Sequence, residues 1–197
     1  GFSVQHTQAE VLGIKSKGFD IYEYRGEKLK GKLEKYLKKN NICAILFSNP
    51  NNPSWVCLTP DELKIIGELA TKYDAIVLED LAYFCMDFRS DKSQPFELPF
   101  QPSVAKYTDN YVLMISSSKV FSYAGERIAI AAISDKLYNR EYPELKRRYH
   151  IARFGDNYHL TYLYTASSGT SHSPQFALAA MMRASVEGKL NFVRVTS

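Results

Sequence analysis

Residues 43–80 read CAILFSNPNNPSWVCLTPDELKIIGELATKYDAIVLED, and this stretch decides the fold. It begins and ends with short apolar runs, residues 43–47 and 75–78. Between them, Thr59 and Glu62 form a Thr-x-x-Glu capping box that predicts the start of a helix. Apolar residues then recur along one face of that helix. A strand, a helix and a second strand in this order predict a parallel pair with a right-handed crossover.

The same alternation continues on both sides of this unit. Two more apolar runs lie at residues 111–115 and 128–133, and a helix pattern covers residues 27–39. Further helices are predicted after Ser134 and after Ser173. Continuous apolar runs of this length are typical of strands buried on both faces of a mostly parallel sheet. The sequence therefore predicts an α/β fold, a three-layer sandwich around such a sheet.

Composition excludes several classes of protein. The chain has 197 residues, of which 45% are hydrophobic and 23% charged, as in ordinary globular domains. No apolar run approaches the roughly 20 residues that cross a bilayer, so we expect no membrane partner. The net charge of +4 is mild, and the most basic stretch, residues 28–39, is interpreted as a solvated helix face rather than a site for an acidic partner. We expect no nucleic-acid partner.

The three cysteines indicate a compartment. Cys43, Cys57 and Cys85 are odd in number, lie in or beside apolar runs and form no Cys-x-x-Cys pair. They are interpreted as buried thiols in a reducing environment, which predicts a cytoplasmic protein.

Polar residues follow three of the apolar runs directly. The first ends in an Asn- and Pro-rich turn, the second in Glu79-Asp80 with Tyr83 close behind, and the third in three serines and Lys119. Each alone has an ordinary explanation: a turn, a helix cap, a surface lysine. Because ligands bind beyond the carboxyl ends of parallel strands, their coincidence at one edge predicts a binding site there.

These residues carry a family resemblance. The motifs Asn49-Pro50-Asn51-Asn52-Pro53-Ser54, Asp80-x-x-Tyr83 and Ser116-x-Ser118-Lys119-x(7)-Arg127 resemble, in order and spacing, those of class I/II aminotransferases of fold type I. Asp80 follows Asn52 by 28 residues and precedes Lys119 by 39. The resemblance covers roughly residues 1–180 and implies the cofactor pyridoxal 5′-phosphate (PLP).

The resemblance assigns a role to each site residue. Lys119 is the amine that would bind PLP covalently and then move the proton of the substrate's alpha carbon. Asp80 would keep the pyridine nitrogen protonated, which makes the cofactor an electron sink. The remaining positions divide into donors to the cofactor's phenolic oxygen, Asn52 and Tyr83, and phosphate ligands, Ser116, Ser118 and Arg127.

Two positions depart from the family's pattern: Ala129, a mild change from a frequent glycine, and Trp55. Trp55 stands where the family usually has a glycine, which would permit a positive φ. This predicts a turn that is relaxed differently, or an indole ring lying against a neighbouring segment.

Some family features have no match in this sequence. A phosphate-cradling turn, an aromatic ring that stacks on the pyridine and a small domain with a carboxylate-binding arginine are all unmatched. We therefore expect an incomplete large domain: residues 1–140 as its PLP-binding core, and residues 141–197 as an interface region leading toward a small domain. Such a fragment is expected to be inactive by itself.

Three activities are compatible with the same cofactor site. The first is transfer of an amino group from an amino acid to a 2-oxo acid. The second is a carbon–sulfur lyase or related reaction, and the third is the sensor domain of a transcription regulator, although no helix-turn-helix pattern occurs in this sequence. The resemblance also implies a homodimer, because the family's sites lie at the subunit interface.

Overall fold

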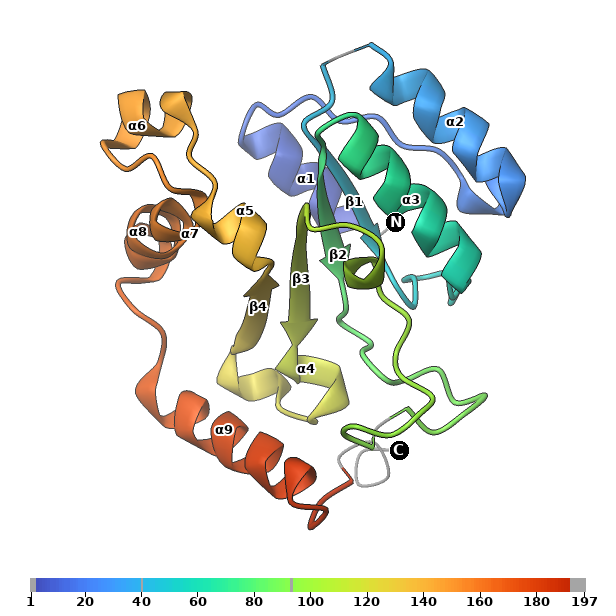
Figure 1. Ribbon diagram of the computed structural model, residues 1–197. Helices are drawn as coiled ribbons and strands as arrows, with labels where there is room; N and C mark the ends of the chain where they lie inside the picture. Colours follow the sequence, from blue (N-terminus) through green and yellow to red (C-terminus); the bar gives the residue numbers. More distant parts are fainter. Residues whose placement is uncertain (1–2, 40, 93, 192–197) are drawn as a thin grey trace.

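A four-stranded sheet forms the centre of the molecule (Figure 1). The computed structural model describes residues 3–39, 41–92 and 94–191. The strands β1 (Ala44–Ser48), β2 (Ile76–Asp80), β3 (Tyr111–Ser116) and β4 (Ala129–Ile133) lie side by side in chain order. The pairs β1–β2 and β2–β3 are parallel, and β3–β4 is antiparallel. The predicted α/β fold with a mostly parallel sheet is confirmed.

The crossover from β1 to β2 is the helix that the capping box predicts. Helix α3 (Pro60–Lys72) begins after Thr59, whose side chain accepts a hydrogen bond from the Glu62 amide. The Glu62 carboxylate accepts one in return from the Thr59 amide. Helix α2 (Glu27–Leu37) buries its three core-facing leucines and packs beside α3 on the same face of the sheet.

The other described helices are short except α1 and α9. In chain order they are α1 (Ser3–Val11), η1 (Ile21–Tyr24), η2 (Val104–Lys106), α4 (Ser117–Val120), η3 (Ala124–Glu126), α5 (Asp135–Asn139), α6 (Pro143–Tyr149), α7 (Phe154–Asp156), η4 (Asn157–Leu163), α8 (Tyr164–Ser167) and α9 (His172–Val186). The helices predicted after Ser134 and Ser173 are therefore present as α5 and α9. Among them, no described helix is long and apolar enough to cross a bilayer.

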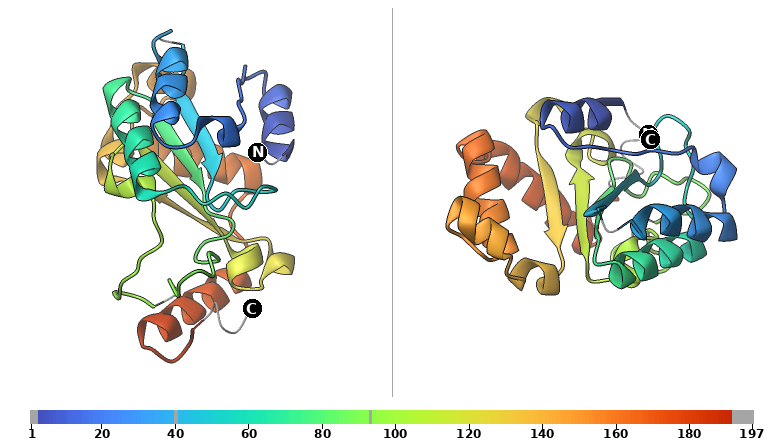
Figure 2. Two further views of the ribbon diagram at one scale, coloured as in Figure 1. Left: turned by 90° about the vertical axis from the view of Figure 1, so that its right-hand side faces the viewer. Right: turned by 90° about the horizontal axis from the view of Figure 1, so that it is seen from above.

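The two faces of the sheet are covered unequally. Helices α2 and α3 lie on one face and α1 on the other, which gives three layers (Figure 2). The α1 layer is thin, because none of its residues is buried. Leu46 on β1 is 43% exposed, and Ala129 and Ala131 on β4 are exposed. The prediction that the strands are buried on both faces is thus wrong for this second face.

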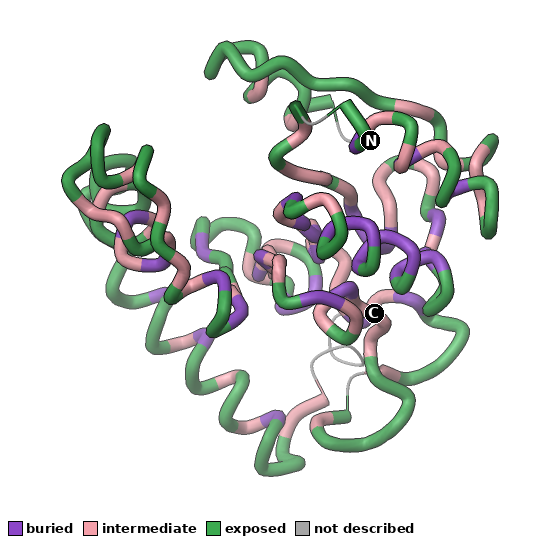
Figure 3. The backbone as a smooth tube through the Cα atoms, turned by 45° about the horizontal axis from the view of Figure 1, so that its top comes forward, coloured by how far each residue is buried: buried purple, intermediate pink, exposed green. Residues whose placement is uncertain are grey.

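The main core lies between the sheet and α3. Leu63, Ala70, Ala75 and Val77 are completely buried there. Buried residues gather in the middle of the molecule, whereas the peripheral helices are mostly exposed (Figure 3). A smaller cluster of buried residues joins α4 to α9. It includes Val120 of α4 and Leu178 of α9.

The cysteine interpretation is correct for one residue of three. Cys85 is buried, but Cys57 is only half-buried and Cys43 is exposed. Cys43 directly precedes β1, at the amino end of that strand.

Candidate active site

The parallel strands bring the predicted residues to one edge of the molecule. In Figure 1, β1, β2 and β3 point down toward α4, and α9 lies below them. Ser48 at the end of β1 is in register with Asp80 at the end of β2. Asp80 in turn pairs with Met114, two residues before the end of β3. The loops after all three strands therefore start at the same edge.

Asn52 and Tyr83 meet at this edge. The Asn52 side-chain amide donates to the Tyr83 hydroxyl at 3.1 Å. The Asn52 loop is braced from within, because Ser48 Oγ accepts from the Asn51 side chain at 3.0 Å and from the Asn52 amide at 3.4 Å. Since the Tyr83 oxygen is the acceptor, its own proton remains available to donate. The pair can thus present one O–H and a second N–H to an anionic oxygen.

Asp80 is a half-buried carboxylate with neutral donors. Its Oδ2 accepts from the Gln5 side-chain amide at 2.8 Å, and its Oδ1 accepts from the Ala82 backbone amide at 3.0 Å. Burial raises the pKa of the Asp80 carboxyl above its ordinary value, and the two hydrogen bonds only partly offset this effect. A cation beside Asp80 would reverse the shift, which suits a protonated ring nitrogen.

Gln5 was not identified from the sequence. It lies on α1, 75 residues before Asp80, in a segment with no motif. The contact depends on α1 docking on the second face of the sheet, and no local pattern encodes that position.

Lys119 lies on the one-turn helix α4, directly after β3. Ser116 caps this helix, because its Oγ accepts from the Ser118 amide at 3.2 Å. The neighbouring Ser117 is buried and donates to the Ile128 carbonyl, which ties the turn to the start of β4. The Lys119 side chain is exposed, so its amine is accessible at this edge.

Arg127 lies close to these serines in the chain topology. It comes two residues before Ala129, the β4 partner of Ser116. Its φ of +52° is left-handed, and its guanidinium donates to the Ala124 carbonyl at 2.7 Å. Within the described residues, no hydrogen bond joins this guanidinium to Ser116 or Ser118. Arg127 therefore lies in the turn before β4, close to Ser116, but its side chain is directed at its own loop.

A buried network of polar groups lies beside the site, and the sequence motifs assign it no role. We call it the polar brace; its central residues are Glu79 and Asn49. Glu79 is fully buried, and its Oε2 accepts from Ser103 Oγ at 2.7 Å and from the Val104 amide at 2.9 Å. Asn49 is also buried, and its side chain accepts from the Leu58 amide at 3.0 Å. Burial raises the pKa of Glu79, although its hydrogen bonds act in the opposite direction. This brace fixes the ends of β1 and β2 relative to η2.

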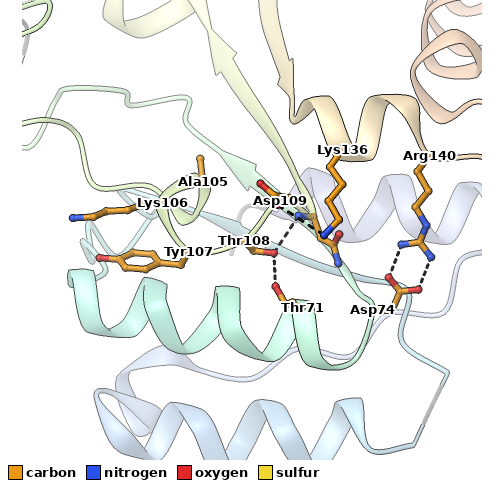
Figure 4. A pocket seen from close by; sticks show the side chains of 10 residues that line it. Thr71, Asp74, Ala105, Lys106, Tyr107, Thr108, Asp109, Lys136 and Arg140 are labelled. Atoms are coloured by element: carbon orange, nitrogen blue, oxygen red, sulfur yellow. Dashed lines mark hydrogen bonds and ion pairs between the residues drawn. The ribbon is translucent and has the colours of Figure 1, made fainter.

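The pocket in Figure 4 lies at the other end of the sheet, beyond the amino ends of β2 and β3 and the carboxyl end of β4. Its charged groups are largely paired with each other. Arg140 binds both carboxylate oxygens of Asp74, at 2.5 and 2.6 Å, and Lys136 lies 3.9 Å from Asp109. It shares no residue with the strand-end site.

Comparison with solved structures defines the class of fold. The PLP-bound C-S lyase from Staphylococcus hominis matches 84% of this chain and 35% of its own, with a TM-score of 0.51 and 18% identity. This likeness shows that the chain shares the fold of that enzyme.

Comparison with sequences defines the family. The family model "Aminotransferase class I and II" matches residues 9–191, so the chain belongs to this family, whose cofactor is PLP. A probable aspartate aminotransferase from Methanocaldococcus jannaschii is 28% identical over 64% of this chain. A putative aminotransferase from Rhizobium meliloti is 36% identical over 48%. The matched regions span 31% and 22% of those two relatives, so the chain covers only a part of their length.

Proposed function

We propose that this chain carries the catalytic core of an aminotransferase that moves an amino group from an amino acid to a 2-oxo acid. The observation that supports this most is the Asn52–Tyr83 hydrogen bond, at the same sheet edge as Asp80 and Lys119. A paired amide and phenol, a half-buried carboxylate and an accessible amine are the groups that a pyridine ring with a phenolic oxygen and an aldehyde requires. The described residues therefore fit PLP.

When bound, PLP supplies the electron sink for the charge that develops at the substrate's alpha carbon. Asn52 and Tyr83 would bind the phenolic oxygen, and Asp80 the ring nitrogen. Ser116, Ser118 and Arg127 would hold the phosphate, with Arg127 exchanging the Ala124 carbonyl for a charged, bidentate partner.

Asp80 acts through its charge. In a half-buried position its carboxylate pairs strongly with a cation, because the surrounding dielectric is low. Gln5 and the Ala82 amide bind one carboxylate oxygen each, so they fix the plane of the carboxylate that would bind the ring nitrogen.

Lys119 carries the proton. Its primary amine, once neutral, would take the proton from the substrate's alpha carbon and hold it at Nζ. Because α4 is anchored by the Ser116 cap and the Ser117–Ile128 contact, the long side chain moves while its backbone stays fixed.

We also propose that residues 1–140 form the core of the PLP-binding large domain, that residues 141–197 lie at a subunit interface of a cytoplasmic homodimer, and that the 197 residues alone are inactive. Large apolar side chains left exposed on η4, α8 and α9 support the interface; they are Leu160, Tyr162, Tyr164 and Phe176. Sedimentation equilibrium of the full-length protein tests the dimer, and a monomer at micromolar concentration would contradict it.

The activity is tested with the purified full-length protein and PLP. A panel of amino acids is offered with 2-oxoglutarate, and formation of glutamate together with the matching 2-oxo acid is measured. We expect transfer at rates on the order of 1 s⁻¹ or faster for at least one donor. Release of ammonia and a thiol from a cysteine conjugate, without glutamate, would instead identify a carbon–sulfur lyase.

A further inference from the structure

Trp55 adopts a backbone conformation that its side chain disfavours. Its φ is +55°, in the left-handed region, where bulky residues are rare and glycine has no penalty. The turn holds it there, because the Trp55 amide donates to the Asn51 carbonyl at 2.7 Å and the Asn51 amide donates to the Val56 carbonyl at 2.9 Å. A strained residue beside a site is an observation from which a role can be inferred.

Burial of the indole does not account for this conformation, since Trp55 is 44% exposed. The indole instead contacts Tyr83. The two ring centroids are 5.2 Å apart and the planes lie at 68°, an edge-to-face arrangement. Tyr83 lies in the turn after β2 and not in a regular strand or helix, so the sheet does not set the direction of its ring.

One loop holds Tyr83 at two points. Asn52 donates to its hydroxyl, and Trp55, three residues later, packs against its ring. The ring contact limits rotation of the phenol, and the hydrogen bond limits the position of its oxygen. Together they leave the hydroxyl proton with a restricted direction.

We propose that Trp55 is a positioning residue for Tyr83: its indole fixes the phenol so that the hydroxyl donates to the phenolic oxygen of PLP. The inference rests on the proposed function, because it takes the Tyr83 hydroxyl to bind that oxygen. It assigns a role to Trp55, which stands where the family usually has a glycine.

The test is a double-mutant cycle on PLP affinity in the full-length protein, measured by equilibrium dialysis. Trp55→Asn and Trp55→Gly remove the ring, and both residues tolerate the left-handed φ, so the backbone is not the variable. We expect each to weaken PLP binding about 3- to 10-fold, the range of one aromatic pair. Trp55→Phe keeps a ring and should stay within about 2-fold of wild type. In a Tyr83→Phe background, Trp55→Asn should change affinity by less than about 2-fold, because the hydroxyl it positions is gone.

A spectroscopic readout accompanies the affinities. A donor to the phenolic oxygen favours its anionic form, so Tyr83→Phe and Trp55→Asn should both raise the pH at which the visible band of bound PLP titrates. Tyr22→Phe is the matched control: it removes the 3.0 Å bond from Tyr22 to the Ser54 carbonyl on the same loop and should leave both readouts unchanged.

Equal weakening by Trp55→Asn in both backgrounds, or no change in affinity and pH midpoint, would overturn the role of Trp55 while the proposed function stands. Absence of PLP binding by the wild type would overturn the proposed function, and this inference with it.

Discussion

Two regions of the sheet are built in opposite ways: the face that α3 covers (the α3 face) and the edge at which β1, β2 and β3 end (the strand-end edge). On the α3 face, apolar side chains such as Leu63 and Val77 are completely buried. A buried carboxylate of this face, Glu62, is paired with Arg25 and two backbone amides. At the strand-end edge, Lys119 is exposed and Asp80 has only neutral donors. Two of its residues, Trp55 and Arg127, have left-handed backbones.

This difference separates stability from function. The α3 face satisfies its groups internally, so substitutions there should change the free energy of unfolding. The strand-end edge keeps charged groups half-satisfied, which costs stability and leaves them free for a ligand. Substitutions there should change PLP binding and turnover with little effect on unfolding.

Leu63→Ala should destabilise the packing of the α3 face. The side chain is completely buried between α3 and the sheet, so truncation leaves a cavity, and we expect a loss of about 3 to 4 kcal/mol in the free energy of unfolding. Urea denaturation measures this. Leu46→Ala on the thin second face, where Leu46 is 43% exposed, is the comparison and should cost about 1 kcal/mol. Equal losses would show that the two faces are not packed differently.

Asp80→Asn should lower turnover at the strand-end edge without destabilising the fold. The shape is kept but the charge that binds the ring nitrogen is lost, so turnover should fall on the order of 10²-fold, about 2.7 kcal/mol. The unfolding midpoint should be unchanged or slightly higher, because a half-buried charge is removed. Near-normal turnover would mean that Asp80 only caps the turn through the Ala82 amide.

Glu62→Gln tests the ion pair on the α3 face through the pH dependence of the free energy of unfolding. Burial of Glu62 would raise its pKa, but the hydrogen bonds from Arg25 and from the Gly26 and Thr59 amides outweigh burial and lower it from 4.5 to about 2. Because the folded pKa is the lower one, this stabilisation is complete above about pH 4.5 and is lost as pH falls toward 2.

At pH 7 the substitution should cost about 2 kcal/mol, less than a fully buried pair, since the Arg25 side chain is 37% exposed. It should also flatten the acid dependence of stability between pH 4.5 and 2. Glu68→Gln, on the same helix, is the control: its pair with Lys64 is exposed on both sides, so its effect should stay within about 0.5 kcal/mol. An unchanged acid dependence in Glu62→Gln would refute this account.

Gln5→Ala should have the smallest effect. It removes one neutral hydrogen bond from the Asp80 carboxylate, so we expect turnover to fall about 3- to 10-fold and unfolding to change by less than about 1 kcal/mol. Gln5→Asn shortens the side chain and should behave like alanine, whereas Gln5→Glu should be worse, because it places a like charge beside Asp80. Full activity of Gln5→Glu would contradict the contact.

The features that sequence predicted are those encoded locally. The apolar runs gave the four strands, and the Thr59–Glu62 capping box gave the start of α3. The parallel topology then placed Asn52, Asp80, Tyr83 and Lys119 at one edge, because carboxyl ends of parallel strands meet there.

The features that sequence missed depend on packing between distant segments. The Gln5–Asp80 bond and the Glu79–Ser103 brace join residues 75 and 24 positions apart. The exposure of Leu46 depends on how far α1 covers the second face. For Trp55, the absent glycine signalled a departure, but only the structure identifies Tyr83 as the ring it contacts.

The central claim is that Lys119 is the residue that binds PLP covalently, and chemical trapping tests it most directly. The full-length protein is loaded with PLP, reduced with borohydride and digested, and the modified peptide is identified by mass spectrometry. We predict a phosphopyridoxyl group on Lys119 and its loss in Lys119→Ala, with Lys106→Ala, at the opposite end of the sheet, as the unaffected control. A reduced adduct on another lysine of the wild type, or one that persists in Lys119→Ala, would contradict the account.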